Sequence, residues 1–225
     1  MSLPKSTKIA SLHPHFHKKM IPAKEALERL KNGNLEFAAG MRDGQALLSD
    51  SKRTALPKEQ NPFAIILGCS DSRVPAEIVF NQGLGDLFVI RVAGNIVAPS
   101  QVGSVEFAAA RFNTRLVVVL GHSQCGAIEA TLEELDQPSE KQWRNLHSIV
   151  ERIRPSVEPL LHTDLVKDRG TLVHHAIRAN VMASVNHLRH GSEILEALIQ
   201  NEGLMVVGAE YSIETGMVEF FDYGY

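Results

Sequence analysis

The sequence predicts an α/β fold: a central, mostly parallel β-sheet flanked by helices, with an N-terminal helical arm and a C-terminal antiparallel strand pair. Along the middle of the chain, short β-branched and aliphatic runs typical of buried strands alternate with longer helical patterns. The last two apolar runs, 204–211 and 217–223, are joined through Gly216, as expected of a hairpin. With 225 residues, 44% of them hydrophobic and 22% charged, the chain can bury a core without disulfides, and we treat residues 1–225 as a single domain.

The first part of the chain has no usable periodicity. Residues 1–21 mix Pro, Ser, Lys and His and are predicted to form an extended or mobile arm. His13, His15 and His17 alternate within it, which could place them on one side of an extended strand, but Pro14 interrupts them and a solvated tail is the simpler interpretation. We assign these histidines no function.

Residues 22–40 have apolar side chains near helical spacing and are predicted to form an amphipathic helix. Gly33 is a weak point at which this helix could break, and Gly40 is a plausible stop. The stripe consists of Ala26, Leu27, Leu30 and Phe37.

Strands and helices then alternate through the middle of the chain, which indicates a parallel sheet with helices on its faces. Ligands of such sheets gather at the carboxyl ends of the strands. The predicted elements are strand 63–68, a short helix opening at Pro75, strand 86–92, helix 100–112, strand 116–121 and helix 125–135.

Two further helical segments precede the final strands. Residues 141–162 have a helical pattern that is expected to be interrupted at Pro155 and Pro159. Residues 171–200 give a long helical pattern with a possible interruption at Gly191.

Charge and hydropathy exclude several classes of function. The formal net charge is −3, and Lys and Arg are scattered, so no nucleic-acid partner is expected. No stretch approaches the roughly 18 consecutive apolar residues that a spanning helix needs, so no membrane partner is expected either. The N-terminal residues lack the apolar core of a secretory signal, which favours a cytoplasmic location.

Only two cysteines occur, Cys69 and Cys125, and each follows an apolar run, 63–68 and 116–121 respectively. Such scarcity makes a disulfide framework improbable. Because each thiol follows a predicted strand, both belong to the edge of the sheet where ligands are expected.

The residues around the two cysteines have the chemistry of a zinc site. His122 and Cys125 are three residues apart across a turn, close enough to bind one ion, and Cys69 at another strand end supplies a third ligand. Two thiolates and one imidazole suit Zn²⁺, and three protein ligands leave the fourth position for water, as in catalytic sites. The alternatives are two buried cysteines and a buried histidine with no metal, or a structural metal, which would need a fourth ligand.

Two motifs carry a family resemblance. Cys-Ser-Asp-Ser-Arg at 69–73 and Gly-His-Ser-Gln-Cys-Gly at 121–126 resemble the signature motifs of the β-class carbonic anhydrases. The segments 91–95 (Arg-Val-Ala-Gly-Asn) and 208–216 are similar to two others of that family, and the resemblance spans 22–222. It implies one Zn²⁺ per subunit, held by Cys69, His122 and Cys125, and reversible hydration of CO₂ to bicarbonate and a proton by zinc-bound hydroxide.

The same resemblance makes Asp71 and Arg73 a catalytic dyad beside the open zinc position. Asp71 as a carboxylate can orient the hydroxide by accepting its hydrogen bond, and a bidentate Arg73 keeps Asp71 ionised and off the metal. Taken without Cys69 nearby, an Asp–Arg pair at this spacing would be an ordinary surface ion pair. Because two thiolates cancel the charge of Zn²⁺, we expect activity to rise toward mildly alkaline pH.

Departures from the family pattern indicate a sub-type. Members with a second, inhibitory bicarbonate site carry Trp where this chain has Ile66. Gln60 resembles a Gln of the constitutively open sub-type that crosses a subunit boundary to bind substrate. We therefore expect the open form, with Asp71 off the zinc.

The substrate pocket leaves a weaker trace, because CO₂ is small and apolar. Phe88 resembles a pocket-lining aromatic of the open sub-type, and Val92 and Gly126 lie beside the zinc motifs. Phe107 stands where many relatives have Tyr. For Phe88 and Phe107 the alternative is an ordinary place in the core.

Relatives form dimers in which the N-terminal helix reaches over the neighbouring subunit, and many pair into tetramers. The apolar stripe of residues 22–40 suits such an arm, so a homodimer or homotetramer is expected. Rival functions are a hydrolase of CS₂ or COS that uses the same zinc hydroxide, a non-catalytic zinc-stabilised oligomer, and a thiol redox sensor.

Overall fold

The computed structural model describes residues 20–41, 59–137 and 144–222. The arm predicted over residues 1–21 therefore lies almost entirely outside the described residues, and so do His13, His15 and His17.

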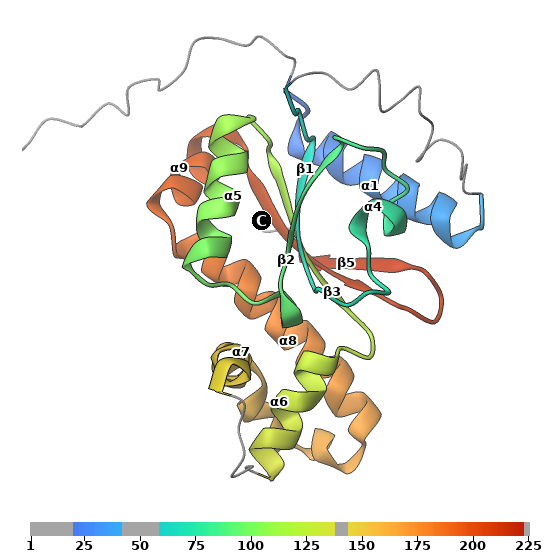
Figure 1. Ribbon diagram of the computed structural model, residues 1–225, viewed down its shortest axis with the longest axis vertical. Helices are drawn as coiled ribbons and strands as arrows, with labels where there is room; N and C mark the ends of the chain where they lie inside the picture. Colours follow the sequence, from blue (N-terminus) through green and yellow to red (C-terminus); the bar gives the residue numbers. More distant parts are fainter. Residues whose placement is uncertain (1–19, 42–58, 138–143, 223–225) are drawn as a thin grey trace, which may run out of the picture.

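A five-stranded sheet forms the centre of the molecule, with the strand order β2-β1-β3-β4-β5 (Figure 1). Strands β2, β1, β3 and β4 run parallel to one another, and β5 runs antiparallel to β4. The predicted fold class is confirmed, and each strand bound differs from the predicted one by at most one residue. The strands are β1 Ala64–Gly68, β2 Leu87–Arg91, β3 Leu116–His122, β4 Met205–Tyr211 and β5 Val218–Asp222.

Helices cover both faces of the sheet (Figure 1). One face packs on α1 (Ala23–Ala38) and α4 (Ala76–Val79). The other packs on α5 (Pro99–Arg111), α8 (Arg169–His190) and α9 (Glu193–Glu202).

Two further helices, α6 (Gly126–Asp136) and α7 (Arg144–Val157), lie beyond the carboxyl ends of β1 and β3, beside the first half of α8 (Figure 1). A third apolar cluster fills the space between them, and it includes both cysteines. Short 3₁₀ turns cover Ala93–Asn95, Glu158–His162 and Asp164–Lys167.

The proline and glycine positions in the C-terminal half had different outcomes. The predicted interruption at Pro155 is wrong: α7 continues through it to Val157, because this proline lies on the exposed face of the last turn, where a carbonyl that loses its partner can bind water. The predicted interruption at Gly191 is confirmed. There α8 ends and Ser192 caps α9, its hydroxyl accepting a hydrogen bond from the Leu195 N–H at 3.2 Å.

Helix α1 is unbroken, and Gly33 is a point of close contact rather than a weakness. A Cβ atom at this position would lie 2.0 Å from the Phe80 carbonyl oxygen, so only glycine allows the helix to approach the segment after α4 so closely. The apolar stripe of α1 packs on this chain's own sheet, in the cluster that also contains β1, β3 and β4. The expected contact of residues 22–40 with a partner subunit remains a prediction.

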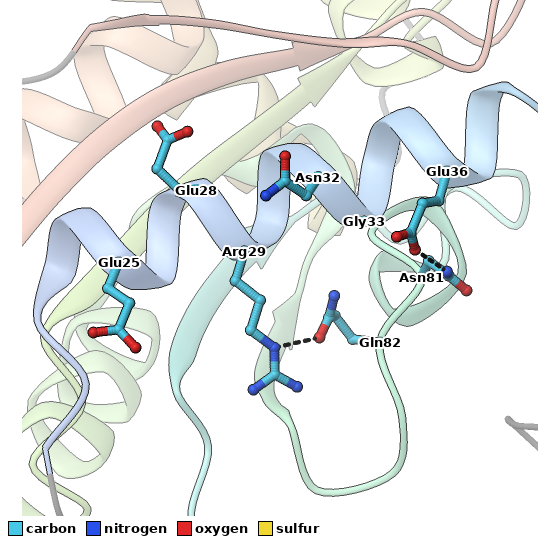
Figure 2. Close-up of a pocket in the computed structure, with 8 residues that line it drawn as sticks. All are labelled: Glu25, Glu28, Arg29, Asn32, Gly33, Glu36, Asn81 and Gln82. Carbon is cyan, nitrogen blue, oxygen red and sulfur yellow. Dashed lines mark hydrogen bonds between the residues drawn. The ribbon is translucent and has the colours of Figure 1, made fainter.

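The exposed side of α1 borders a polar hollow of about 520 Å³ against the segment after α4 (Figure 2). Two hydrogen bonds join residues that line it: Arg29 Nε donates to Gln82 Oε1 at 3.0 Å and Asn81 Nδ2 donates to Glu36 Oε2 at 2.8 Å. The hollow shares no residue with either cysteine loop.

The described helices include none whose length and apolar character would let it cross a membrane.

Candidate metal centre

Parallel pairing of β1 and β3 brings the two cysteine motifs together. Gly68 pairs with Leu120 in the sheet, so Cys69 and His122 leave neighbouring strands at the same edge. Cys125 follows after a turn and begins α6. The sequence-based expectation that two strand ends carry the thiols is confirmed.

Cys69, His122 and Cys125 form what we call the metal-ligand cluster. Their Sγ and imidazole nitrogen atoms lie within 4.8 Å of one another, and the three residues are 6%, 0% and 1% exposed. His122 Nδ1 lies 2.8 Å from the Ser123 carbonyl oxygen, to which it can donate a hydrogen bond. That bond leaves Nε2 as a buried nitrogen with no hydrogen-bond partner, turned toward the two thiols. A bare imidazole nitrogen beside two sulfur atoms is the donor set of a Zn²⁺ site, so these residues fit the metal.

The two thiols are electrostatically unequal. A hydrogen bond from the Cys125 thiol lowers the pKa of Cys69 well below its ordinary value; burial opposes this, and the adjacent His122 imidazole and the backbone N–H groups of Gly94 and Asp71 lower the pKa further. The same hydrogen bond, together with burial, raises the pKa of Cys125. The pair thus releases its first proton readily, as a centre that takes up a cation must.

A loop after β2 supports the Cys69 sulfur. The Gly94 N–H donates to Cys69 Sγ at 3.4 Å, and Gly94 has φ of +68°, a left-handed conformation that favours glycine. Asn180 Nδ2 of α8 donates to the Gly94 carbonyl at 2.7 Å and fixes this loop. The sequence analysis missed Asn180, although a polar residue in a buried apolar stripe of a helix was a signal.

Asp71 and Arg73, which we call the dyad, form the expected pair. Arg73 Nε and Nη2 donate to the two carboxylate oxygens of Asp71 at 3.0 and 2.8 Å. The guanidinium holds the pKa of Asp71 well below its usual range, and partial burial acts in the opposite direction. Asp71 Oδ2 lies 4.0 Å from His122 Nε2, so the carboxylate stands beside the metal-ligand cluster while its oxygens face Arg73.

Arg91 at the end of β2 fixes the backbone of the first motif. It donates to the carbonyl oxygens of Cys69 and Asp71, at 3.0 Å from Nε and 2.5 Å from Nη2. The loop that carries one thiol and the dyad is thus tied to the neighbouring strand, which leaves the dyad side chains as its adjustable part.

Two residues without a role in the sequence analysis also reach the dyad. Gln124 accepts hydrogen bonds from Arg73, and Glu214, in the turn between β4 and β5, accepts one from Gln124. No local pattern indicates these contacts, because the partners are 51 and 90 residues apart.

The residues predicted to bind substrate are distributed unevenly. Val92 packs on the apolar cluster that contains Cys69, and Gly126 is the exposed first residue of α6, next to Cys125. Phe88 lies on the edge strand β2, with its ring 6.3 Å from that of Phe107 and in the cluster of the α5 face. Gln60 is exposed before β1. The substrate roles of all four remain predictions.

Comparisons with known proteins agree on one family. A family model described as carbonic anhydrase matches residues 64–218. A carbonic anhydrase of Mycolicibacterium smegmatis is 44% identical over 134 residues, which cover 59% of this chain and 63% of that protein. The carbonic anhydrase 2 of Mycobacterium tuberculosis is 37% identical over 88% of this chain and 92% of its own length. Among solved structures, a β-carbonic anhydrase of Aspergillus fumigatus superimposes with a TM-score of 0.69 at 26% identity, over 86% of this chain and 89% of that one.

Proposed function

The chain belongs to the β-class carbonic anhydrase family, and we propose that it catalyses the reversible hydration of CO₂ to bicarbonate and a proton. The observation that carries the proposal is the buried, unpartnered Nε2 of His122, which faces two thiols and has an ionised carboxylate 4.0 Å away. A site that binds a metal without using it would need the thiols and the imidazole, but not the dyad.

The proposed ligands of one Zn²⁺ per subunit are Cys69 Sγ, His122 Nε2 and Cys125 Sγ. When bound, zinc supplies a Lewis acid that lowers the pKa of a coordinated water molecule toward neutrality. Three protein ligands would leave a fourth coordination position for water. Because two thiolates neutralise the charge of the ion, we expect this acidification to be weaker than with three histidines, and activity to rise with pH.

The dyad orients the attacking group and keeps the open position free. Asp71 accepts a hydrogen bond from the hydroxyl group that adds to CO₂ and so directs its lone pair at the carbon atom. Arg73, by donating to both carboxylate oxygens, keeps Asp71 ionised and its oxygens engaged beside the ligands. This arrangement supports assignment to the open sub-type.

CO₂ needs an apolar wall more than specific hydrogen bonds. Val92, which packs beside Cys69, and Gly126, which leaves the entrance of α6 free of a side chain, are proposed to line this wall. Gln60 and Phe88 are proposed to contribute from the same pocket or across a subunit boundary.

The chain is further proposed to act as a homodimer or homotetramer in the cytoplasm. Support for assembly comes from the edge strand β2 and from Phe107, whose residue surface is 52% exposed beside that strand. Both cysteines are free thiols, the state that a reducing compartment maintains. Sedimentation velocity of the purified chain tests the assembly, and cell fractionation tests the location.

Two rival functions make different predictions. A hydrolase of CS₂ or COS would release sulfide from those molecules faster than it hydrates CO₂, and a zinc-stabilised oligomer would turn over none of them. The family match does not favour the hydrolase. The dyad does not favour the zinc-stabilised oligomer, since an ionised carboxylate beside an open coordination position has a use in catalysis but none in a structural site.

Stopped-flow CO₂ hydration from about pH 6.5 to about pH 9 tests the proposal on protein of measured zinc content. We expect one zinc per chain and a rate that rises with pH. Full zinc occupancy without CO₂ hydration would overturn the proposal, and sulfide release from COS would then identify the hydrolase.

A further inference from the structure

A carboxylate outside the two signature motifs is connected to the dyad by hydrogen bonds. Glu214 lies in the turn between β4 and β5, and its carboxylate accepts from three side chains. Ser123 Oγ donates at 2.7 Å, Gln124 Nε2 at 2.6 Å and Ser212 Oγ at 3.1 Å. Two of the donors belong to the loop between His122 and Cys125, so this turn is fastened to the loop that carries two metal ligands.

Gln124 passes this connection on to Arg73. Its Oε1 accepts from Arg73 Nη1 at 3.1 Å, and its backbone oxygen accepts from Nη2 at 3.2 Å. Because an ionised Glu214 can only accept, it requires the NH₂ group of Gln124 on its own side and so turns the amide oxygen toward Arg73. Glu214 therefore sets the orientation in which Gln124 can bind the guanidinium.

The guanidinium needs such support. The Arg73 side chain is 45% exposed, and water competes for the hydrogen bonds of an exposed ion pair. Even in the paired state the Asp71 carboxylate lies 4.0 Å from His122 Nε2, so a broken pair would leave it close to where a metal ion would be bound. Gln124 binds Arg73 through Nη1 and Nη2, whereas Asp71 binds it through Nε and Nη2, so the two partners hold different edges of the guanidinium.

The turn that carries Glu214 is itself fixed on both sides. The Ile213 N–H donates to Ser123 Oγ at 3.0 Å, and Asn34 of α1 binds the Gly216 carbonyl at 2.9 Å. Glu214 is thus a fixed acceptor at one end of a chain of contacts that runs through Gln124 to the dyad.

We propose that Glu214 is a positioning residue: through Gln124 it holds Arg73 against Asp71 and so keeps the Asp71 carboxylate out of the open coordination position. The inference rests on the proposed function for its catalytic consequence, but its structural part can be tested without CO₂. The alternative is that Glu214 only closes the turn between β4 and β5.

Zinc release to a chromophoric chelator separates these two roles in Glu214→Gln. Its amide keeps the size of the side chain but replaces an acceptor with a donor, so it cannot serve Ser123 and Gln124 as the carboxylate does. If Asp71 is then free to become a fourth protein ligand, zinc should leave about tenfold more slowly than from wild type, as from a closed site. A loosened site would release zinc faster, because lost supporting contacts usually weaken metal binding about 10- to 100-fold.

Three further variants locate the effect. Gln124→Met breaks the same chain of contacts one step later and should slow release equally. In an Asp71→Asn background, Glu214→Gln should leave release unchanged, because no carboxylate remains to bind the metal. Glu151→Gln, which removes a carboxylate from the exposed side of α7, is the matched control and should release zinc like wild type.

The double variant E214Q/Q124E reverses the donor and acceptor. Its new amide can donate to the new carboxylate, which in turn accepts from Arg73, so the double variant should recover at least half of the wild-type release rate. A merely structural role would predict two additive defects instead.

CO₂ hydration is measured on the same samples, and Glu214→Gln should lower kcat/KM about tenfold, the effect of one charge-assisted hydrogen bond. Unchanged or faster zinc release from Glu214→Gln would overturn the inference. An inactive wild type whose Glu214→Gln variant still releases zinc slowly would overturn the proposed function and leave the inference standing.

Discussion

Two neighbouring parts of the candidate site are held by different forces. The metal-ligand cluster of Cys69, His122 and Cys125 is at most 6% exposed, whereas the Arg73 side chain of the dyad is 45% exposed. Backbone pairing of β1 with β3 and packing of α6, α7 and α8 fix the cluster, so its geometry follows from the core. The dyad is fixed by hydrogen bonds that water can compete for, so its geometry depends on a few polar partners.

This contrast has a functional reading. A cation site gains from rigidity, because ligands held in place pay no ordering cost when the ion binds. A carboxylate that must stay beside an open position without entering it depends on the balance between its partners. Substitutions should therefore separate metal retention from turnover.

Substitution in the metal-ligand cluster should remove metal retention and turnover together. Cys69→Ser exchanges a thiolate for a poor zinc ligand, so zinc content should fall to near zero and CO₂ hydration by at least about 10³-fold. Elemental analysis and stopped-flow hydration measure the two. Ser70→Ala, at the exposed neighbouring position, is the control. A zinc-free variant that still hydrates CO₂ would contradict the proposed function.

Substitution in the dyad should remove turnover and spare the metal. Arg73→Lys keeps the charge, but an ammonium group cannot donate along two parallel hydrogen bonds, so kcat/KM should fall about 10- to 100-fold. Zinc content should stay at the wild-type value. Arg152→Lys on the exposed side of α7 controls for the change of side chain. Loss of zinc from Arg73→Lys would show that the cluster and the dyad form one unit and are not held independently.

Substitution of Asn34 tests whether the dyad depends on packing between α1 and the turn that carries Glu214. Its amide binds the carbonyl oxygens of Val79 and Gly216, and its oxygen accepts from the Val218 N–H at 2.8 Å. Asn34→Ala leaves these groups unsatisfied, so the free energy of unfolding should fall by about 2–3 kcal/mol. We expect zinc to be retained and kcat/KM to fall about threefold, because the turn that carries Glu214 loses an anchor.

Urea unfolding measures the stability change, and Asn32→Ala, on the exposed side of the same helix, is the matched control. If Asn34→Ala lost zinc together with activity, the cluster would depend on α1 as much as the dyad does.

Acid should lower the stability of the folded chain through the Glu214 carboxylate, and this is the smallest effect that we expect. Hydrogen bonds from Ser123 and Gln124 lower the pKa of Glu214 from 4.5 to about 2. A lowered pKa in the folded state contributes stability that is present above the unfolded value and is lost as pH falls through the folded value. Between these two pH values, Glu214→Gln should lose stability less steeply than wild type.

Urea midpoints at pH 7 and at about pH 3 measure this difference, and Glu151→Gln controls for the change in net charge. If the urea midpoint fell equally between the two pH values for wild type and Glu214→Gln, the carboxylate would not be held by its three donors in solution.

The outcome of the sequence analysis follows the same division. Residue types and local spacing determined the cluster: thiols after two apolar runs and a His-x-x-Cys turn were enough to bring three ligands to one edge of a parallel sheet. The mostly parallel sheet with its antiparallel last strand followed from periodicity and from Gly216, whose φ is +76°. Asp71 and Arg73, two residues apart, were also within reach of local reasoning.

The roles of the remaining residues depend on how the chain folds. Gly33 looked like a helix breaker until the Phe80 carbonyl proved to lie where its side chain would be. Pro155 looked like a stop because sequence does not show which face of a helix meets water. Glu214 and Gln124 had no local signature for their link to the dyad, because the contacts that make it join residues 51 and 90 positions apart. Asn180 stood out as a polar residue in an apolar stripe, but its partner Gly94 lies 86 residues away. Hydrogen-bond partners across such separations depend on the path of the folded chain, whereas ligand chemistry and strand periodicity are properties of the residues themselves.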